Sequence, residues 1–259
     1  MIETKTRTVL CIAHPGHELR VFGWMGQNRP LVYVITDGSG PNRASRFEST
    51  RLLIEEAGGR LGFLAGAFSD RSFYEMISEG DPEPFIDLAR RFAADWEAAG
   101  VEVVAGDMLE GFSTTHDLCR MMINAAVEKL RRQGRSLTNL EFALESMTPP
   151  EITPGSVVIS LDDTDFARKR HAALAAYPQL ASEVERLISQ YGEGAFRNEV
   201  LLPATVPAGL TWDDPKEPFY ETYGRKQIAA GHYQHLISYQ EHIQPLARAL
   251  WDWALSDRK

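Results

Sequence analysis

Cysteine is scarce in this chain of 259 residues, which excludes the class of small disulfide-rich proteins. Only Cys11 and Cys119 occur, the first in an apolar run and the second in a helical pattern, and no Cys-x-x-Cys motif is present. Two isolated cysteines do not form the disulfide framework of a small secreted domain. With 44% apolar residues, the chain is instead long enough to bury a substantial hydrophobic core.

Positive charge and long apolar segments are lacking as well. Lysine and arginine total 27 against 36 aspartates and glutamates, and the net charge of −9 argues against a nucleic-acid partner. No apolar run approaches the ~20 residues that a membrane span needs, and the start of the chain is polar without an apolar signal region. We therefore expect a cytoplasmic protein without a membrane span.

Short apolar runs and helical patterns alternate along the chain. Strands are predicted for the apolar runs 9–13, 31–36, 61–68, 101–105, 140–144 and 157–161. Helices are predicted for 45–57, 85–99 and 117–133, with further helical stretches near 163–190 and 222–256. This alternation predicts an α/β fold with a mostly parallel sheet and helices on both faces.

The whole chain, 1–259, is expected to form a single domain, because no repeat, low-complexity tract or long charge run divides it. The proline-rich piece 203–218 is interpreted as a surface loop and not as a linker. Residues 163–259 are expected to be a helical elaboration that forms a lid over the site, covers the sheet or builds a subunit contact. The sequence leaves the oligomeric state open.

The most informative stretch follows the first predicted strand. That strand ends in His14-Pro15-Gly16-His17-Glu18, where proline and glycine impose a tight turn. In an open α/β sheet, ligands bind at the carboxyl ends of the strands. Two imidazoles in one turn can converge on one ion at the ~2.0–2.1 Å of zinc–nitrogen bonds. The ordinary alternative is that each histidine is a core or surface residue.

His116 lies in a comparable place, between the strand predicted at 101–105 and the helix that follows. If the two strands are parallel, their loops lie at one edge of the sheet and three imidazoles can meet there. Three protein ligands with one open position are typical of a catalytic zinc site. The alternative is that His116 is a residue near a helix N-terminus, flanked by the capping candidates Thr115 and Asp117.

Four other polar residues near these loops have two interpretations each. Asp37, in a Thr-Asp-Gly turn, is either a turn former or a carboxylate that orients a histidine or a water. Glu18 either caps the helix after the histidine turn or shuttles protons beside the metal. Arg20 and Arg46 either present a cationic rim to the substrate or are ordinary solvated surface residues.

These motifs resemble those of the LmbE-like, PIG-L-type deacetylases. In that family the first strand ends in Ala-His-Pro-Asp-Asp-Glu, and residues 13–18 read Ala-His-Pro-Gly-His-Glu. The Thr-Asp-Gly turn at 36–38, the arginine-bearing helix from Arg46 and the loop 113–116 are similar too. The resemblance extends to about residue 130. It implies a Rossmann-like three-layer α/β sandwich and zinc-dependent removal of the N-acetyl group from N-acetylglucosamine conjugates.

Position by position, the resemblance implies that His14 is the first zinc ligand, that His116 is the last, and that His17 replaces a ligand aspartate. Gly16 stands where the family has its general base, and Ser113 stands where it has a histidine that stabilises the intermediate or acts as acid. A positioned acid or base contributes roughly 10²–10⁴ in rate. Both proton-handling positions are therefore altered, while the metal ligands are retained.

Other residues are then expected to take over the missing roles. Glu18, Asp37 and Glu110 are the nearest candidates in sequence for the proton carrier, and Glu18 or Asp37 is expected to take this role. Arg20, Arg46 and Ser113 are expected to contact the substrate. The chain is thus predicted to be a hydrolase with Zn²⁺ or another divalent transition metal. Its expected reaction is the removal of an N-acyl group, chiefly N-acetyl, from a small-molecule amino sugar or sugar conjugate.

Three alternatives remain open at this point. The first is a non-catalytic member that binds a sugar or a metal, which the replacements at Gly16 and Ser113 favour. The second is an amide hydrolase that acts on a thiol–sugar conjugate. The third is a nucleotide-binding Rossmann enzyme, which is disfavoured because the first turn lacks Gly-x-Gly-x-x-Gly.

Overall fold

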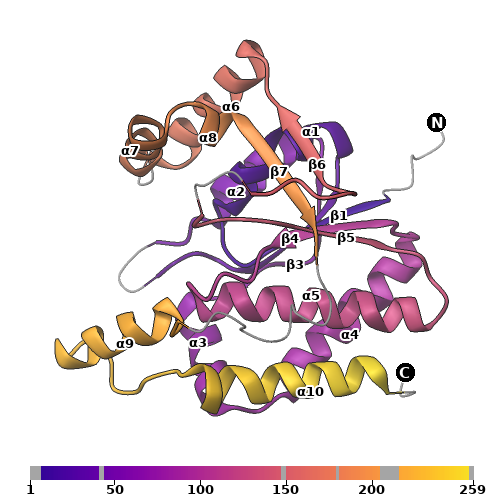
Figure 1. Cartoon of the computed structure of the whole chain (residues 1–259), viewed down its shortest axis with the longest axis vertical. Helices are drawn as coiled ribbons and strands as arrows, with labels where there is room; N and C mark the ends of the chain where they lie inside the picture. The colour runs from indigo at the N-terminus through magenta and orange to yellow at the C-terminus, as the bar shows by residue number, and fades with distance from the viewer. Residues whose placement is uncertain (1–6, 41–43, 147–149, 179–180, 205–215, 257–259) are drawn as a thin grey trace.

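The computed structural model describes residues 7–40, 44–146, 150–178, 181–204 and 216–256, and its framework is a seven-stranded sheet (Figure 1). The strands are β1 (Thr8–Ile12), β2 (Leu31–Thr36), β3 (Arg60–Phe68), β4 (Val103–Asp107), β5 (Thr138–Phe142), β6 (Val157–Ser160) and β7 (Asn198–Pro203). Their order is β3-β2-β1-β4-β5-β7-β6. The five strands β3, β2, β1, β4 and β5 pair in parallel. Beyond β5, strand β7 pairs antiparallel with β5 and β6 pairs antiparallel with β7.

Helices connect and cover these strands. They are the 3₁₀ helix η1 (His17–Val21), α1 (Phe22–Asn28), α2 (Phe47–Glu56), α3 (Asp70–Glu79), α4 (Glu83–Ala99), α5 (Thr114–Arg132), α6 (Asp163–Ala176), α7 (Ala181–Tyr191), α8 (Gly194–Arg197), α9 (Phe219–Ala229), the π-helix η4 (Tyr239–Ile243) and α10 (Gln244–Leu255). None of the helices in the described ranges is long and apolar enough to cross a membrane.

The two faces of the sheet carry separate hydrophobic cores, since successive side chains of a strand point to opposite faces. In β1, Val9 and Cys11 join the core formed with α3, α4, α5 and α10. Leu10 and Ile12 join the core formed with α1, α2 and α6. Figure 1 shows these helical layers on opposite sides of the sheet. The predicted α/β architecture, a mostly parallel sheet covered on both faces, is therefore confirmed.

Besides the four-residue helix α8, two elements escaped the sequence analysis. The first is α3, which begins after Ser69, whose hydroxyl accepts the N–H of Ser72 at 3.0 Å. The second is β7, which lies between β5 and β6 and belongs to the part of the chain expected to be helical. The stretch 163–259 therefore contributes a strand to the sheet as well as helices. Of the proline-rich piece 203–218, residues 205–215 lie outside the described residues.

The strand order reverses between β1 and β4, and this reversal locates the site. From β1 the chain runs to β2 and β3 on one side, and then to β4 and β5 on the other. In open α/β sheets, ligands bind at such a switch point, in the crevice outside the carboxyl ends of the strands. The histidine turn follows β1 there, and the segment 108–113 follows β4.

Candidate functional site

The turn after β1 is held by a hydrogen bond to β4 and by glycine at one position. The N–H of Ala13 donates to Oδ2 of the fully buried Asp107 at 2.8 Å. Gly16 has φ 107° and ψ −22°, a left-handed conformation that glycine adopts without steric cost. Helix η1 begins directly afterwards at His17, so that His14 and His17 both lie next to the first turn of α5.

Three imidazole rings meet at this crevice. The ring centroid of His14 lies 5.3 Å from that of His17 and 5.0 Å from that of His116. The centroids of His17 and His116 are 4.6 Å apart, and all three ring pairs are edge-to-face. The structure thus brings together the three histidines that the sequence nominates from two separate loops.

Burial favours the neutral form of two of these rings. Burial lowers the pKa of His14, although the hydrogen bond to Asp70 opposes this effect. The pKa of His116 lies well below its ordinary value because of burial and, next, the adjacent His17 and His14. Neutral imidazole is the form that coordinates a metal ion.

Carboxylates lie behind two of the rings. His14 Nδ1 lies 2.6 Å from Thr36 Oγ1 and 3.1 Å from Asp70 Oδ1, and His17 Nδ1 lies 2.9 Å from Asp107 Oδ2. A carboxylate that accepts from one ring nitrogen sets the tautomer and leaves the other nitrogen for an ion. Burial raises the pKa of Asp70, but hydrogen bonds with His14 and Thr36 outweigh burial and hold that pKa well below its usual range.

The donor set fits a divalent transition metal. Imidazole nitrogens about 2.0–2.1 Å from one tetrahedral ion place their ring centroids about 5 Å apart, which matches the observed spacing. Within the described residues, the buried Nδ1 of His116 has no hydrogen-bond partner. In the side-chain positions of the structure, no group of three or more histidine, cysteine, aspartate or glutamate residues among those described has the geometry to hold a metal ion. We therefore expect the rings to rotate on binding.

Sequence reasoning missed Asp107 and Asp70, the two carboxylates behind His17 and His14. Asp107 ends a buried strand, and a carboxylate at that position, in the strand paired with β1, is a usable signal. Asp70 begins α3 beyond β3, and it reaches His14 because β3 pairs with β2. No local pattern in the sequence marks Asp70, since its role depends on the strand order.

Glu18 is fully buried behind the histidine turn. Its carboxylate accepts the N–H of Gly16 at 2.8 Å and the hydroxyl of Thr50 at 3.1 Å, and it also accepts the hydroxyl of Tyr177 at the end of α6. Burial raises the pKa of Glu18, while the hydrogen bond from Tyr177 and those from the turn lower it. These contacts tie the turn after β1 to α2 and α6.

Asp37 and Arg46 lie together at the turn after β2. Oδ1 of Asp37 accepts the N–H of Ser39 at 2.9 Å, and its carbonyl accepts the N–H of Arg46 at 2.8 Å. A side chain at Gly38 would meet the Arg46 guanidinium at 2.7 Å and the Pro15 ring at 3.0 Å. This turn therefore packs against the histidine turn, with the Arg46 side chain over it.

Ser113 and Arg20 lie in the segments that follow β4 and β1, respectively. Ser113 precedes α5 as its N-cap residue, and its hydroxyl makes no capping hydrogen bond. Arg20, in η1, donates to the carbonyls of Ala143 and Leu144 at 3.2 Å and 2.7 Å, so its guanidinium is directed to the segment after β5. The roles of both residues in substrate binding stay predictions.

The conformation of Gly16 leads to a stability prediction. Gly16→Asp, which restores the family residue, and Gly16→Ala are both expected to lower the free energy of unfolding by about 1–3 kcal/mol, because a side chain is strained at this φ. Gly26→Ala is the matched control, since Gly26 lies in α1 without a positive φ and its new Cβ would meet no atom within 4 Å. It is expected to be neutral or stabilising. Urea titration measures all three, and an unchanged midpoint in Gly16→Asp would contradict the prediction.

A row of aromatic rings extends outward from His116. Phe112 lies over His116 at a centroid distance of 6.3 Å and stacks on Phe219 of α9 at 4.8 Å. Tyr223 continues the row at 5.9 Å from Phe219. Phe219 and Tyr223 are 47% and 43% exposed, respectively. The crevice is therefore bordered by accessible aromatic surface.

Fold and site together define an α/β protein with a three-histidine cluster at the switch point of a mostly parallel sheet. No family model matches the sequence, and no curated protein matches it. Among solved structures, the chain is similar to deacetylase Dbv21, described as the antimicrobial reagent A40926 pseudoaglycone deacetylase. The TM-score is 0.51 at 13% identity, over 77% of this chain and 97% of that one.

A second similar structure is a triple mutant of a deacetylase involved in the teicoplanin biosynthetic pathway. The TM-score is 0.50 at 11% identity, over 76% of this chain and 97% of the other. The shared fold supports the resemblance to deacetylases that the sequence motifs carry. Identities this low establish the fold and leave the reaction to be argued from the site.

Proposed function

We propose that the protein is a metal-dependent hydrolase that removes an N-acyl group, most simply N-acetyl, from a small molecule containing an amino sugar. The observation that carries this proposal is the cluster of His14, His17 and His116 at the switch point, with Asp70 and Asp107 behind two of the rings. These three histidines would hold Zn²⁺ or another divalent transition metal. When bound, such an ion activates a water and polarises the amide carbonyl.

The chain itself supplies orientation and a largely buried environment. Asp70 and Asp107 set the tautomers of His14 and His17, so that the outward nitrogen of each ring is unprotonated. Burial of the rings strengthens electrostatic interactions at the crevice. Deep burial of Asp107 also keeps the hydrogen bond to His17 away from competing water.

The two carboxylates that the sequence predicts as proton carriers, Glu18 and Asp37, suit different roles. Glu18 is fully buried and tied to the backbone of the turn, which suits a residue that positions His14 and His17. Asp37 is partly exposed and lies in the turn that packs against Pro15, which suits a carboxylate that exchanges protons with substrate and solvent. We therefore favour Asp37 as the proton carrier.

The substrate class has two supports. Accessible aromatic rings such as Phe219 and Tyr223 offer flat apolar surface beside the crevice, and small-molecule sites combine such surface with a few polar groups. Of the two deacetylases with a similar fold, one is involved in the teicoplanin biosynthetic pathway and the other is the A40926 pseudoaglycone deacetylase. Arg20, Arg46 and Ser113 are further candidates for contacts with the substrate.

Asp70→Asn is expected to weaken metal binding by about 10–100-fold, because the loss of the carboxylate loosens the tautomer and orientation of His14. The affinity is measured by competition with a coloured chelator. Asp252→Asn on the exposed side of α10 is the control and is expected to leave the affinity unchanged. Equal affinities in Asp70→Asn and the wild type would show that the carboxylate behind His14 has no part in metal binding.

The reaction is tested by release of free amine from a panel of N-acetylated sugars and sugar conjugates. We expect amine release that requires added zinc or a related divalent ion and stops with a chelator. No amine from any member of the panel with any of these ions would refute the hydrolase proposal.

The competing proposal is a binding protein that has lost the chemistry. It is favoured by Gly16, which offers no side chain at the position of the family's general base, and by the enclosed hydrogen bonds of Glu18. Saturable sugar binding without turnover, at full metal occupancy, would support the binding protein over the hydrolase.

A further inference from the structure

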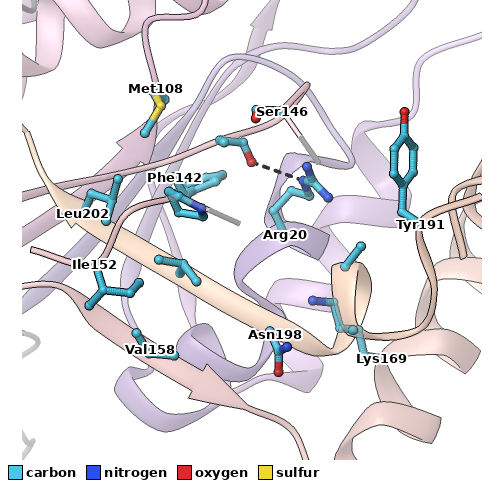
Figure 2. A pocket seen from close by; sticks show the side chains of 15 residues that line it. Arg20, Met108, Phe142, Ser146, Ile152, Val158, Lys169, Tyr191, Asn198 and Leu202 are labelled. Atoms are coloured by element: carbon cyan, nitrogen blue, oxygen red, sulfur yellow. Dashed lines mark hydrogen bonds between the residues drawn. The ribbon is translucent and has the colours of Figure 1, made fainter. Parts of the chain in front are cut away.

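A cavity of about 730 Å³ opens beside the site, between the end of β5, strands β6 and β7, and helix α8 (Figure 2). This volume lies within the range of small-molecule pockets, roughly 300–1,000 Å³. Its walls include Met108 after β4, Phe142 at the end of β5 and Leu202 in β7. The part of the chain beyond residue 150 therefore builds much of this cavity.

The cavity is rich in apolar side chains, and some of them are unusually exposed. Ile152 is 54% exposed, Val158 is 53% exposed and Tyr191 is 49% exposed, and all three line the cavity. Exposed large apolar residues that gather in one concave place mark binding sites, whereas scattered ones are ordinary. Figure 2 shows Ile152 and Val158 on one side of the cavity and Tyr191 at another.

The charged groups of the wall have partners within the protein. Nζ of Lys169 lies 2.9 Å from Oε1 of the fully buried Glu199, which also accepts two N–H groups at the start of α1. The Arg20 guanidinium donates to carbonyl oxygens of the segment after β5. Because these cations are already paired, the cavity favours an apolar group over an anion.

The cavity is continuous with the elements that carry the histidine cluster. Arg20 lies in η1, the same short helix that begins with His17. Met108 directly follows Asp107, which bonds His17, and Phe142 is the register partner of Asp107 in the parallel pair β4–β5. A molecule bound at the three histidines therefore has the cavity within reach at the carboxyl ends of β4 and β5.

We infer that this cavity binds an alkyl or aryl group of the substrate, so that the substrate is an amphiphilic N-acylated amino sugar. The identity of the substrate rests on the proposed function, whereas binding of an apolar group to the cavity does not. The apolar group is either the N-acyl chain itself or a substituent on the sugar.

The test is a pair of ligand series measured by titration calorimetry with chelator present, so that no turnover occurs. One series lengthens the N-acyl chain of glucosamine, and the other lengthens the alkyl group of N-acetylglucosamine β-glycosides, all below their micelle concentrations. Affinity is expected to rise about fourfold per added methylene in one series until the cavity is filled. The series that shows this rise identifies the source of the apolar group.

Two variants link the effect to the cavity. Val158→Glu and Ile152→Ser, both at exposed positions, are expected to abolish the dependence on chain length, whereas Leu52→Glu on α2, 52% exposed, leaves it intact. No rise in either series, or a rise that survives both cavity variants, would overturn the inference. Amine release is measured separately, with added zinc and without chelator. Chain-length-dependent binding together with no amine release in that assay would sustain the inference and refute the proposed function. Amine release without chain-length-dependent binding would do the reverse.

Discussion

His116→Ala is expected to reduce amide hydrolysis by about 10³-fold or more, since an ion that polarises a carbonyl and activates water contributes several kcal/mol to the barrier. His116 joins the cluster from α5, whereas His14 and His17 come from the turn after β1. Removal of its ring leaves two neutral ligands, which hold a transition metal far less tightly than three. The rate is measured as amine release at saturating added metal.

The control for this variant is His171→Ala on the exposed face of α6, which removes an imidazole elsewhere and is expected to retain full activity. Thermal unfolding of both variants excludes misfolding as the cause of a loss. A folded His116→Ala protein with undiminished turnover would contradict the assignment of His116 as a ligand.

Arg120→Met is expected to lower the free energy of unfolding by about 3–5 kcal/mol, the cost of removing one partner from a buried charged network. The Arg120 side chain is fully buried in α5. Its guanidinium donates to the carbonyl of Asp107, to the carbonyl of Leu140 at 3.0 Å and to Oδ1 of Asn139 at 3.1 Å. Methionine retains most of the volume but removes the guanidinium donor to these buried oxygen atoms.

The matched control is Arg132→Met, in the last turn of the same helix, where the side chain is exposed. Its expected change stays within about 0.5 kcal/mol. Both variants are compared by chemical denaturation with a shared m-value. A difference of less than about 1 kcal/mol between them would mean that the network around Arg120 is not what holds α5 to β4 and β5.

The sequence was most informative where the apolar residues of an element are continuously buried. The apolar run 31–36 coincides with β2, and the amphipathic pattern at 85–99 coincides with α4 apart from its first turn. Strand β7 pairs antiparallel with both β5 and β6. It was missed because Val200 and Leu202 are only partly buried and the strand begins with two polar residues. Helix α3 is short, and only Phe73 and Ile77 of its residues are fully buried.

In the candidate site too, the sequence predicts some residues, and others are recognised only in the structure. His14 and His17 are visible because they share one turn at the end of a strand, and His116 is visible because it follows another strand. Asp70 was not visible, since its contact with His14 exists only because β2 lies between β1 and β3. The burial of Glu18 depends likewise on Tyr177, far along the chain.

The central claim is that two separate loops share one metal ion, and elemental analysis of untagged purified protein tests it most directly. Wild type is compared with His17→Ala and His116→Ala. The account predicts about one transition-metal ion per wild-type chain, and loss of that ion in both variants, since a catalytic site uses three protein ligands. Wild-type protein that carries no metal and takes up none on reconstitution would contradict it.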